Sequence, residues 1–399
     1  MRELTILQIN DLHGYVAPHP ELVRKPDGKW RFVELGGLAR IAQIFKAVRA
    51  ERPGAVIALD NGDTFHGTHL AVSSRGSALV PMLNTLNLDG MTLNLDGMTV
   101  HWEFAYGPDG VRALARELRH PILAINCFEK KTDALVFPPF RIVERAGLRI
   151  AVIGLACPIV DKTMPADFSA GVYFKIGNAE LPAWISRVRE QETADLVVVL
   201  SHLGFPQDVK LANDVRGIDV IVSGHTHNRM DRPAIVNGTV IFQSGCHGSF
   251  VGRLDLQIDR QQVTGHAHRL IRVDAALGED SEVKALVDAA LATEQPLSHV
   301  VGSVTAPLHR YAMLNAPMDD VLLEAVAEAA GTSIALSNGW RYGAPVPPGP
   351  VTLNDLWNIV PTNPPVSRVD LTGAELHALL EENLERTFAP IHTRKWADT

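Results

Sequence analysis

Residues 4–13 read LTILQINDLH, an apolar stretch that runs directly into the carboxyl and imidazole side chains of Asp11 and His13. The β-branched and leucine residues of its first half predict a buried strand over residues 4–9. Successive side chains on extended backbone point to opposite sides, so residues two apart, such as Asp11 and His13, point to the same side. The stretch therefore predicts a sheet strand that ends in a pair of metal-type ligands.

Three later stretches repeat this arrangement of an apolar strand followed by carboxylate or imidazole side chains. They are AVIAL at 55–59 before Asp63, LVVVL at 196–200 before His202, and IDVIVS at 218–223 before His225 and His227. A single histidine at a strand end is most often a surface or hydrogen-bonded residue, but four such clusters are hard to obtain by chance. Because strand ends at one sheet edge converge, these side chains predict one shared site.

The residue types of this site indicate its chemistry. Carboxylate and imidazole groups without a thiolate are the ligands expected for zinc, manganese or Fe(II). One carboxylate placed between two such ions can bridge them at roughly 3.5–4 Å, the spacing of two-metal hydrolases. The pattern therefore predicts a hydrolase that holds two divalent metal ions (Mn, Zn or Fe).

Amphipathic helices alternate with the predicted strands, as they do in α/β proteins. Apolar residues at helical spacing over 38–48 predict a helix that ends before Pro53 and Gly54. Strands at 140–143 and 148–155 pair in opposite directions, and Asn237-Gly238 predicts a hairpin between 234–236 and 240–242. These elements predict one sheet of mixed strand direction with helices on both faces.

Composition excludes several classes of partner. The 399-residue chain has a net charge of −8 and no basic run, which argues against a nucleic acid polymer. Its three cysteines are too irregularly spaced for a disulfide framework or a zinc ribbon, and we expect them to be buried. With no signal-peptide core and no apolar run long enough to cross a bilayer, a cytoplasmic protein without a membrane partner is expected. The oligomeric state stays open.

Chain length and a change in composition near residue 275 predict two domains. Residues 1–275 would form the domain with the dinuclear metal site. The Ala-rich, acidic stretch 275–294 predicts a helix that falls largely within a helical linker at 276–299. Residues 300–399 would form a smaller domain with helices at 318–330 and 373–387.

A tandem repeat precedes His101: residues 86–92 and 93–99 both read LNLDGMT. If one copy forms a strand, the other must form a loop, so the repeat bears on where His101 lies. A neutral duplication is a simpler interpretation than a functional one.

The ordered motifs resemble the calcineurin-like metallophosphoesterase superfamily and, within it, the 5′-nucleotidase branch. They are Asp11-Leu12-His13-Gly14, Gly62-Asp63, His101-Trp102-Glu103-Phe104, Ser201-His202-Leu203-Gly204 and Gly224-His225-Thr226-His227. The match covers residues 4 to about 260 well and about 300–388 more loosely. The resemblance implies an α/β fold, with a β-sandwich flanked by helices (αββα) and a smaller α/β C-terminal domain of the 5′-nucleotidase type.

The resemblance also implies two ligand sets and a reaction. One metal would be held by Asp11, His13, Asp63 and His227. The other would be held by Asp63, His101, His202 and His225. Asp63 would bridge the two ions, and metal-bound hydroxide would attack the phosphorus of a phosphomonoester. The implied substrate is a small-molecule phosphate ester, with nucleotides and nucleotide catabolism as the expected case.

One motif departs from the family pattern Gly-Asn-His-Glu and reads Val100-His101-Trp102-Glu103 here. His101 replaces an Asn ligand and can still bind metal, which implies a catalytic role for it beside Asp63. Trp102 replaces the histidine that stabilises the transition state or protonates the leaving group. An indole N–H donates a hydrogen bond but cannot protonate an alkoxide.

This departure leaves two alternative functions open. The His-Trp-Glu-Phe pattern is similar to that of the thiosulfohydrolases of bacterial sulfur oxidation, whose thiol leaving group needs less acid help. A sulfur-ester hydrolase is therefore the first alternative. The tandem repeat and the short second domain leave a non-catalytic metal-binding remnant as the second.

Residues 337–343 read SNGWRYG and resemble the family's substrate loop. Arg341 would contact the anion through its forked guanidinium, and Asn338 would also bind substrate. Trp340 or Tyr342 would stack on a base or pack beside nearby prolines. Because relatives usually continue beyond the length of this chain, a truncated second domain is expected.

Three further histidines lie near the motif loops, and a structural role is the more common one for each. They are His66, His69 and His247.

Overall fold

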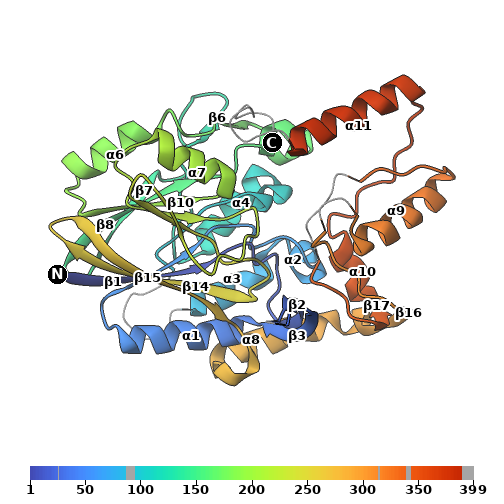
Figure 1. Ribbon diagram of the computed structural model, residues 1–399, viewed down its shortest axis with the longest axis horizontal. Helices are drawn as coiled ribbons and strands as arrows, with labels where there is room; N and C mark the ends of the chain where they lie inside the picture. The colour runs from blue at the N-terminus through green and yellow to red at the C-terminus, as the bar shows by residue number, and fades with distance from the viewer. Residues whose placement is uncertain (26, 87–94, 313–314, 338–342, 389–399) are drawn as a thin grey trace.

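The computed structural model describes residues 1–399 except 26, 87–94, 313–314, 338–342 and 389–399 (Figure 1). Two β-sheets pack face to face, and helices cover the outer face of each. The residue patterns alone predicted a single sheet, and that interpretation was wrong. The αββα fold class implied by the family resemblance is confirmed. Strands with the same apolar pattern belong to different sheets, which periodicity cannot reveal.

The first sheet has the strand order β15-β14-β1-β4-β5. Its strands are β1 (Arg2–Ile9), β4 (Val56–Asp60), β5 (Gly97–Met98), β14 (Phe250–Asp259) and β15 (Gln262–Arg272). The N-terminal strand β1 lies in the middle, antiparallel to β14 and parallel to β4. The parallel pairing brings the carboxyl ends of β1 and β4 to the same edge.

The second sheet has the order β12-β13-β11-β10-β8-β7. Its strands are β7 (Phe140–Arg145), β8 (Leu148–Leu155), β10 (Leu196–Ser201), β11 (Val220–Ser223), β12 (Ala234–Val236) and β13 (Thr239–Phe242). The predicted hairpins β7–β8 and β12–β13 are both antiparallel and confirmed. Strands β8, β10, β11 and β13 run parallel, so β10 and β11 also end together.

Each central strand buries both faces, which is why its sequence is almost continuously apolar. Leu4 and Ile6 of β1 pack against Val198 and other side chains of the second sheet. Leu7 and Ile9 point the other way, into the layer formed by α1 (Leu38–Glu51), α3 (Val80–Thr85), α4 (Gly107–Glu117) and α8 (Ser281–Leu291). On the second sheet, α6 (Leu181–Glu190) and α7 (Phe205–Asp214) form the corresponding layer (Figure 1).

Short elements fill the loops around the sandwich. Two small sheets pair β2 (Pro18–Arg24) with β3 (Trp30–Gly36) and β6 (Cys127–Glu129) with β9 (Val172–Phe174). The short helices are α2 (His69–Ser73), η1 (Ser77–Leu79), η2 (Trp102–Tyr106), α5 (Val160–Thr163) and η3 (Ala166–Ser169). All three cysteines are buried and outside any disulfide, as expected. Among the described helices, none has both the length and the apolar character needed to span a bilayer.

The predicted helix over 275–294 is broken. It consists of η4 (Ala275–Leu277), α8 and η5 (Ala292–Ser298). Gly278 adopts a left-handed φ of 72°, and the Asp280 side chain accepts hydrogen bonds from the first turn of α8, so a new helix begins there. The sequence did not predict this break, because the helix propensity of an Ala-rich stretch favours one continuous helix.

The C-terminal part contains β16 (Val300–Val304), α9 (Pro317–Ala330), β17 (Gly349–Thr352), α10 (Leu353–Ile359) and α11 (Gly373–Phe388). Its core is a small cluster around Met318. This part contacts the sandwich directly: the Tyr311 hydroxyl donates to Glu21 Oε1 at 2.5 Å, and the Ala344 amide donates to the Tyr15 hydroxyl at 2.8 Å. The domain boundaries at 275 and 300 stay predictions.

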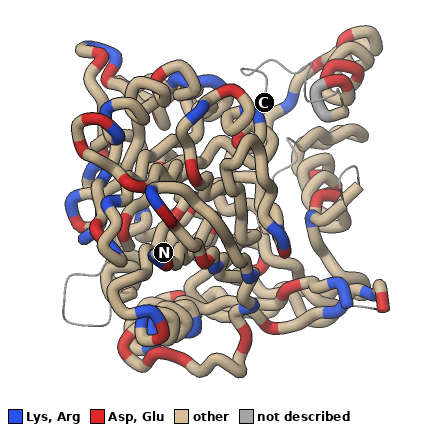
Figure 2. Tube along the Cα trace, turned by 60° about the vertical axis from the view of Figure 1, so that its left-hand side comes forward, with Lys and Arg blue, Asp and Glu red and all other residues tan. Residues whose placement is uncertain are grey.

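Figure 2 shows acidic and basic residues interspersed along the described trace. A polyanion needs a concentrated basic face, and the described residues gather no such stripe in this view.

Candidate dinuclear metal centre

Loops that follow four parallel strand ends carry most of the predicted ligands. Asp11 and His13 follow β1, Asp63 follows β4, His202 follows β10, and the loop after β11 carries His225 and His227. The ends of β1 and β4 meet those of β10 and β11 across the sandwich. All seven predicted metal ligands form two adjoining groups there.

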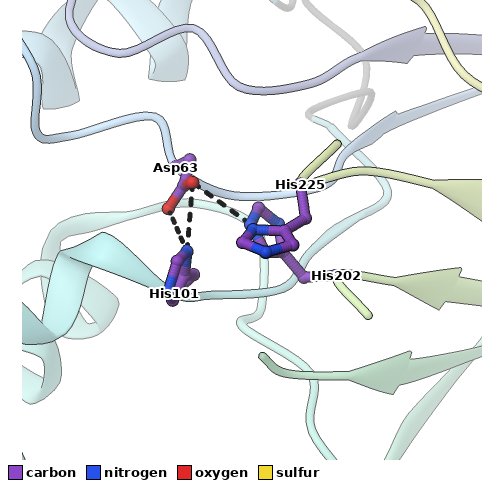
Figure 3. Close-up of side chains that lie close together, drawn as sticks. All are labelled: Asp63, His101, His202 and His225. Carbon is purple, nitrogen blue, oxygen red and sulfur yellow. Dashed lines mark hydrogen bonds and ion pairs between the residues drawn. The ribbon is translucent and has the colours of Figure 1, made fainter. Parts of the chain in front are cut away.

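The first group consists of Asp63, His101, His202 and His225, whose ligand atoms lie within 4.8 Å of one another. Figure 3 shows the Asp63 carboxylate facing the imidazoles of His101 and His202, with His225 beside them. His101 Nδ1 lies 3.1 Å from Asp63 Oδ1, and His202 Nε2 lies 3.2 Å from Asp63 Oδ2.

The second group consists of Asp11, His13 and His227. His227 Nε2 lies 3.1 Å from His13 Nε2 and 3.3 Å from Asp11 Oδ1. Asp63 Oδ2 is 3.9 Å from His13 Nε2, so the carboxylate in the first group also faces the second. Asp63 thus lies between the two groups, where a bridging ligand would stand.

Hydrogen bonds orient the ligand atoms toward this centre. His202 Nδ1 lies 2.5 Å from the Asn61 carbonyl and His13 Nδ1 lies 3.0 Å from the His66 carbonyl, which assigns the proton to Nδ1 in both rings. The lone pair of each ring is then on Nε2, and both Nε2 atoms face Asp63. The Asp11 Oδ2 atom accepts from the His225 amide at 2.9 Å, which leaves Oδ1 toward His227.

Five of the seven candidate ligands adopt a positive φ, which non-glycine residues rarely do. The angles are 51° at Asp11, 50° at His13, 54° at Asp63, 73° at His225 and 56° at His227. Each such residue costs roughly 1–3 kcal/mol and persists only where surrounding contacts hold it. Their concentration here distinguishes the site from ordinary loop ends.

Burial and mutual charge shift the pKa values of these groups in opposite directions. Burial would raise the pKa of Asp63, but the neighbouring His101 and His202 outweigh it and hold it well below its usual range. Burial would lower the pKa of His202, but Asp63 and Asp11 raise it to about 9. Burial dominates at His13 and lowers its pKa to about 4, so this ring is neutral at neutral pH.

These features fit a pair of divalent cations. Two carboxylates and five imidazoles converge at buried or half-buried positions, the donor set expected for zinc, manganese or Fe(II). Asp11 Oδ1 and His202 Nε2 are fully buried, and within the described part of the chain they make ion-pair contacts but no well-aligned hydrogen bond. Buried polar atoms of this kind need a partner, and one cation in each group of ligands would supply it.

Trp102 lies at the rim of the first group. Its amide donates to Asp63 Oδ1 at 2.8 Å, so its backbone helps to hold that carboxylate. Its indole is half-buried and stacks on His66, with ring centroids 5.1 Å apart at 20°. The structure therefore places the indole beside the first group of candidate ligands, and its catalytic role remains a prediction.

The three additional histidines have different surroundings. His66 is buried against Trp102 and Tyr106. His247 is buried with its ring centroid 5.8 Å from that of His13, beside the second group. His69 makes an ion pair of 2.7 Å with Glu294 of η5 and contacts Trp357 of α10, which places it between the sandwich and the C-terminal part.

The predicted substrate residues Asn338, Trp340, Arg341 and Tyr342 lie outside the described residues, and so do 87–94 of the tandem repeat. The second copy of the repeat supplies β5 at Gly97–Met98. His101 follows it directly and reaches Asp63, so the described copy places this histidine in the site.

Sequence patterns did not assign roles to the residues that hold the loops. Glu103 is fully buried and bonds the amides of Thr64 and His101 at 2.7 and 2.8 Å, which joins the Asp63 loop to the His101 loop. Asn61 and Gln8 form a similar buried support on the other side. The signal that the sequence offered for Gln8 was a polar residue within the apolar stretch ILQI.

One buried carboxyl near the site should make a contribution to stability that falls with rising pH. Asp208 of α7 accepts from the Ser201 hydroxyl at 2.6 Å, and burial raises its pKa from 3.8 to about 7. The folded protein thus keeps a proton that the unfolded chain releases, so this contribution is complete below pH 3.8 and is lost as the pH rises to about 7. The slope from one such group is about 1.4 kcal/mol per pH unit.

We expect Asp208→Asn, which stays neutral at all these pH values, to lack this contribution, so that its free energy of unfolding relative to the wild type rises with pH. Urea unfolding of the metal-free proteins at several pH values between 4 and 7 measures the free energy of unfolding of the variant and the wild type. Parallel curves for the variant and the wild type would contradict the assignment.

Comparison with known proteins places the chain among similar sequences and folds. A family model described as 5′-nucleotidase, C-terminal domain, matches residues 300–397. A probable 5′-nucleotidase of Treponema pallidum is 26% identical over 457 residues, covering 96% of this chain and 75% of its own length.

Two solved structures from Thermus thermophilus share the fold. The sulfate thiohydrolase SoxB, solved with glycerol, has a TM-score of 0.85 and 25% identity over 97% of this chain and 79% of its own. A 5′-nucleotidase precursor has a TM-score of 0.78 and 23% identity over 90% of this chain and 74% of its own. The likeness therefore extends over nearly the whole chain and includes both the sandwich and the smaller C-terminal part.

Proposed function

We propose that the chain, which belongs to the calcineurin-like metallophosphoesterase superfamily in its 5′-nucleotidase branch, hydrolyses phosphomonoesters. As a hydrolase of phosphoric esters, it would use two divalent metal ions for this reaction. The proposed substrates are nucleotides, and the proposed location is the cytoplasm. The observation that carries the proposal is the position of the Asp63 carboxylate, which faces both groups of candidate ligands.

The proposed roles follow from that geometry. One ion would be held by Asp11, His13, Asp63 and His227. The other would be held by Asp63, His101, His202 and His225. When bound, such ions supply a water nucleophile activated at neutral pH and positive charge for the phosphoryl oxygens. Manganese, zinc and iron all accept these ligands, and we propose manganese as the first ion to test.

The chain's own side chains orient and shield this chemistry. The Trp102 amide donates to Asp63, and the Nδ1 atoms of His13 and His202 donate to backbone carbonyls. These bonds hold the ligands in one arrangement, which avoids reorganisation during reaction. Ligand burial excludes bulk water and strengthens the electrostatic interactions there. We further propose that Arg341 and Asn338 contact the phosphate group and that Trp340 or Tyr342 contacts the base.

The test is metal-dependent turnover. Purified protein stripped with a chelator should release phosphate from nucleoside monophosphates and p-nitrophenyl phosphate only after Mn²⁺ is restored, with activity saturating near two ions per chain. Phosphate release and metal content are measured on the same samples. If neither substrate releases phosphate at any Mn²⁺, Zn²⁺ or Fe²⁺ concentration, the proposed function fails.

A second function is favoured by one observation, the indole of Trp102 beside the site. A thiolate leaves without a proton donor, so a sulfonate bound to a cysteine sulfur is a substrate class that tolerates this indole. The similarity to SoxB, named as a sulfate thiohydrolase, supports this alternative. Release of sulfate from a peptide cysteine S-thiosulfonate at rates above phosphate release would select it.

A further inference from the structure

We propose that Asn61 is a positioning residue for the metal centre, which sets the spacing between the loop of Asp63 and the strand ends of His202 and His225. This inference rests on the proposed metal centre and adds a residue that touches no ion. Asn61 directly follows β4, two residues before Asp63, and it is fully buried. Its neighbours all belong to the segments that carry the ligands.

The side chain of Asn61 crosses from the first sheet to the second. Its Nδ2 atom donates to the carbonyl of Ser201 at 2.9 Å and to that of Val222 at 2.7 Å. These carbonyls lie at the ends of β10 and β11, directly before the loops that carry His202 and His225. One amide group thereby fixes both strand ends to the Asp63 loop.

The main chain of Asn61 orients a ligand as well. Its carbonyl lies 2.5 Å from His202 Nδ1, which assigns the proton to that nitrogen and leaves Nε2 for Asp63 and the metal. Its Cβ also packs against Gly224, where an added Cβ would lie only 2.8 Å away. Gly224 directly precedes His225, so Asn61 sets how closely this backbone approaches.

A second buried amide supports the first. Gln8 of β1 donates through Nε2 to Asn61 Oδ1 at 2.6 Å and to the Ser223 carbonyl at 2.6 Å. Its Oε1 accepts from the Ser244 hydroxyl at 2.6 Å. Because both Oδ1 and Nδ2 of Asn61 have hydrogen-bond partners, its side chain has one preferred orientation. Buried networks in which every polar group is bonded give a rigid geometry.

The chain offers a closely matched control in Asn126. It is also fully buried, donates to two carbonyls, those of Ala156 and Lys175, at 2.8 Å each, and accepts from the Ala156 amide at 2.9 Å. Neither Asn126 nor these partners is a candidate ligand. Replacing either asparagine by Ala therefore removes the same number of hydrogen bonds, and only Asn61 bonds to the strand ends beside the ligands.

The experiment compares Mn²⁺ binding to full-length wild type, Asn61→Ala and Asn126→Ala by calorimetry and by metal analysis after dialysis. For Asn61→Ala we expect the dissociation constant of one ion to rise roughly 10- to 100-fold, as when hydrogen-bond partners of metal ligands are changed. At an Mn²⁺ concentration that fills both sites of the wild type, the metal content of Asn61→Ala should fall from two ions per chain toward one. Asn126→Ala should bind like the wild type.

Stability is measured on the metal-free proteins by urea unfolding, so that a loss of folding is separated from a loss of affinity. If Asn61→Ala does not fold, Gln8→Met replaces it. This change removes the donor to Asn61 Oδ1, together with the bonds of Gln8 to Ser223 and Ser244, but keeps the bonds of Asn61 to the two strand ends, so it should weaken the same ion less. Equal Mn²⁺ affinity and content in the substituted protein and Asn126→Ala overturns the inference. A wild type that binds no Mn²⁺, Zn²⁺ or Fe²⁺ overturns the proposed function itself.

Discussion

Replacing Asp63 by Asn is expected to remove metal-dependent turnover and to lower the content of both ions. The carboxylate faces both groups of ligands, so its loss weakens two sites at once. The loss in kcat/KM should exceed the roughly 10- to 100-fold that follows when a hydrogen-bond partner of a ligand is changed. Steady-state phosphate release and metal analysis of the dialysed protein measure the two effects.

Asp60→Asn is the matched control for this substitution. Asp60 is three residues away and fully buried, but it bonds the Gly62 amide at 2.9 Å and the Thr64 hydroxyl at 2.7 Å rather than the ligands. Burial raises its pKa to about 8, so it is largely protonated at neutral pH and a neutral amide is a close substitute. Retained turnover in Asp63→Asn, at the level of Asp60→Asn, would refute the bridging role. A non-catalytic remnant would show no turnover in any variant.

Replacing Trp102 by His is expected to raise activity on esters with poor leaving groups. The indole cannot protonate an alkoxide, whereas an imidazole at this position can. For an alkyl phosphate we expect kcat/KM to rise at least about tenfold, short of the roughly 10²- to 10⁴-fold of a fully aligned general acid. For p-nitrophenyl phosphate, whose leaving group needs no proton, the change should be small.

The informative quantity is therefore the kcat/KM for the alkyl phosphate divided by that for p-nitrophenyl phosphate, measured in each protein. Trp102→Phe keeps an aromatic ring beside His66 without adding an acid, and its ratio should stay near that of the wild type. The amide that donates to Asp63 is part of the backbone and is retained in both variants. An unchanged ratio in Trp102→His would show that this position does not govern leaving-group departure.

The sequence predicted the ligand clusters because their chemistry is local. Asp11 and His13, or His225 and His227, are close in the chain and follow apolar strands, so residue type and position at a strand end predicted them. The extended backbone assumed for these pairs was wrong, since all four residues have a positive φ. The family resemblance and the two-sheet fold it implies are confirmed. The assignment of single residues to catalysis and to substrate binding stays predicted.

Other features could not be predicted because they depend on tertiary contacts. Strands β1 and β10 have similar apolar patterns but belong to different sheets, and pairing is decided by partners far away in sequence. The role of Asn61 depends on carbonyls some 140 and 161 residues later in the chain. The break at Gly278 arises from a single left-handed residue in a stretch whose composition favours a continuous helix.

The central place of β1 has a consequence for synthesis on the ribosome. One neighbour, β4, emerges soon after it, but the other, β14, begins only at Phe250. At about 5–20 residues per second, a nascent chain waits on the order of 10 to 50 s before that edge of β1 can pair. During this interval an apolar strand edge is open to unwanted association, so heterologous expression should benefit from slow growth at low temperature or added chaperone.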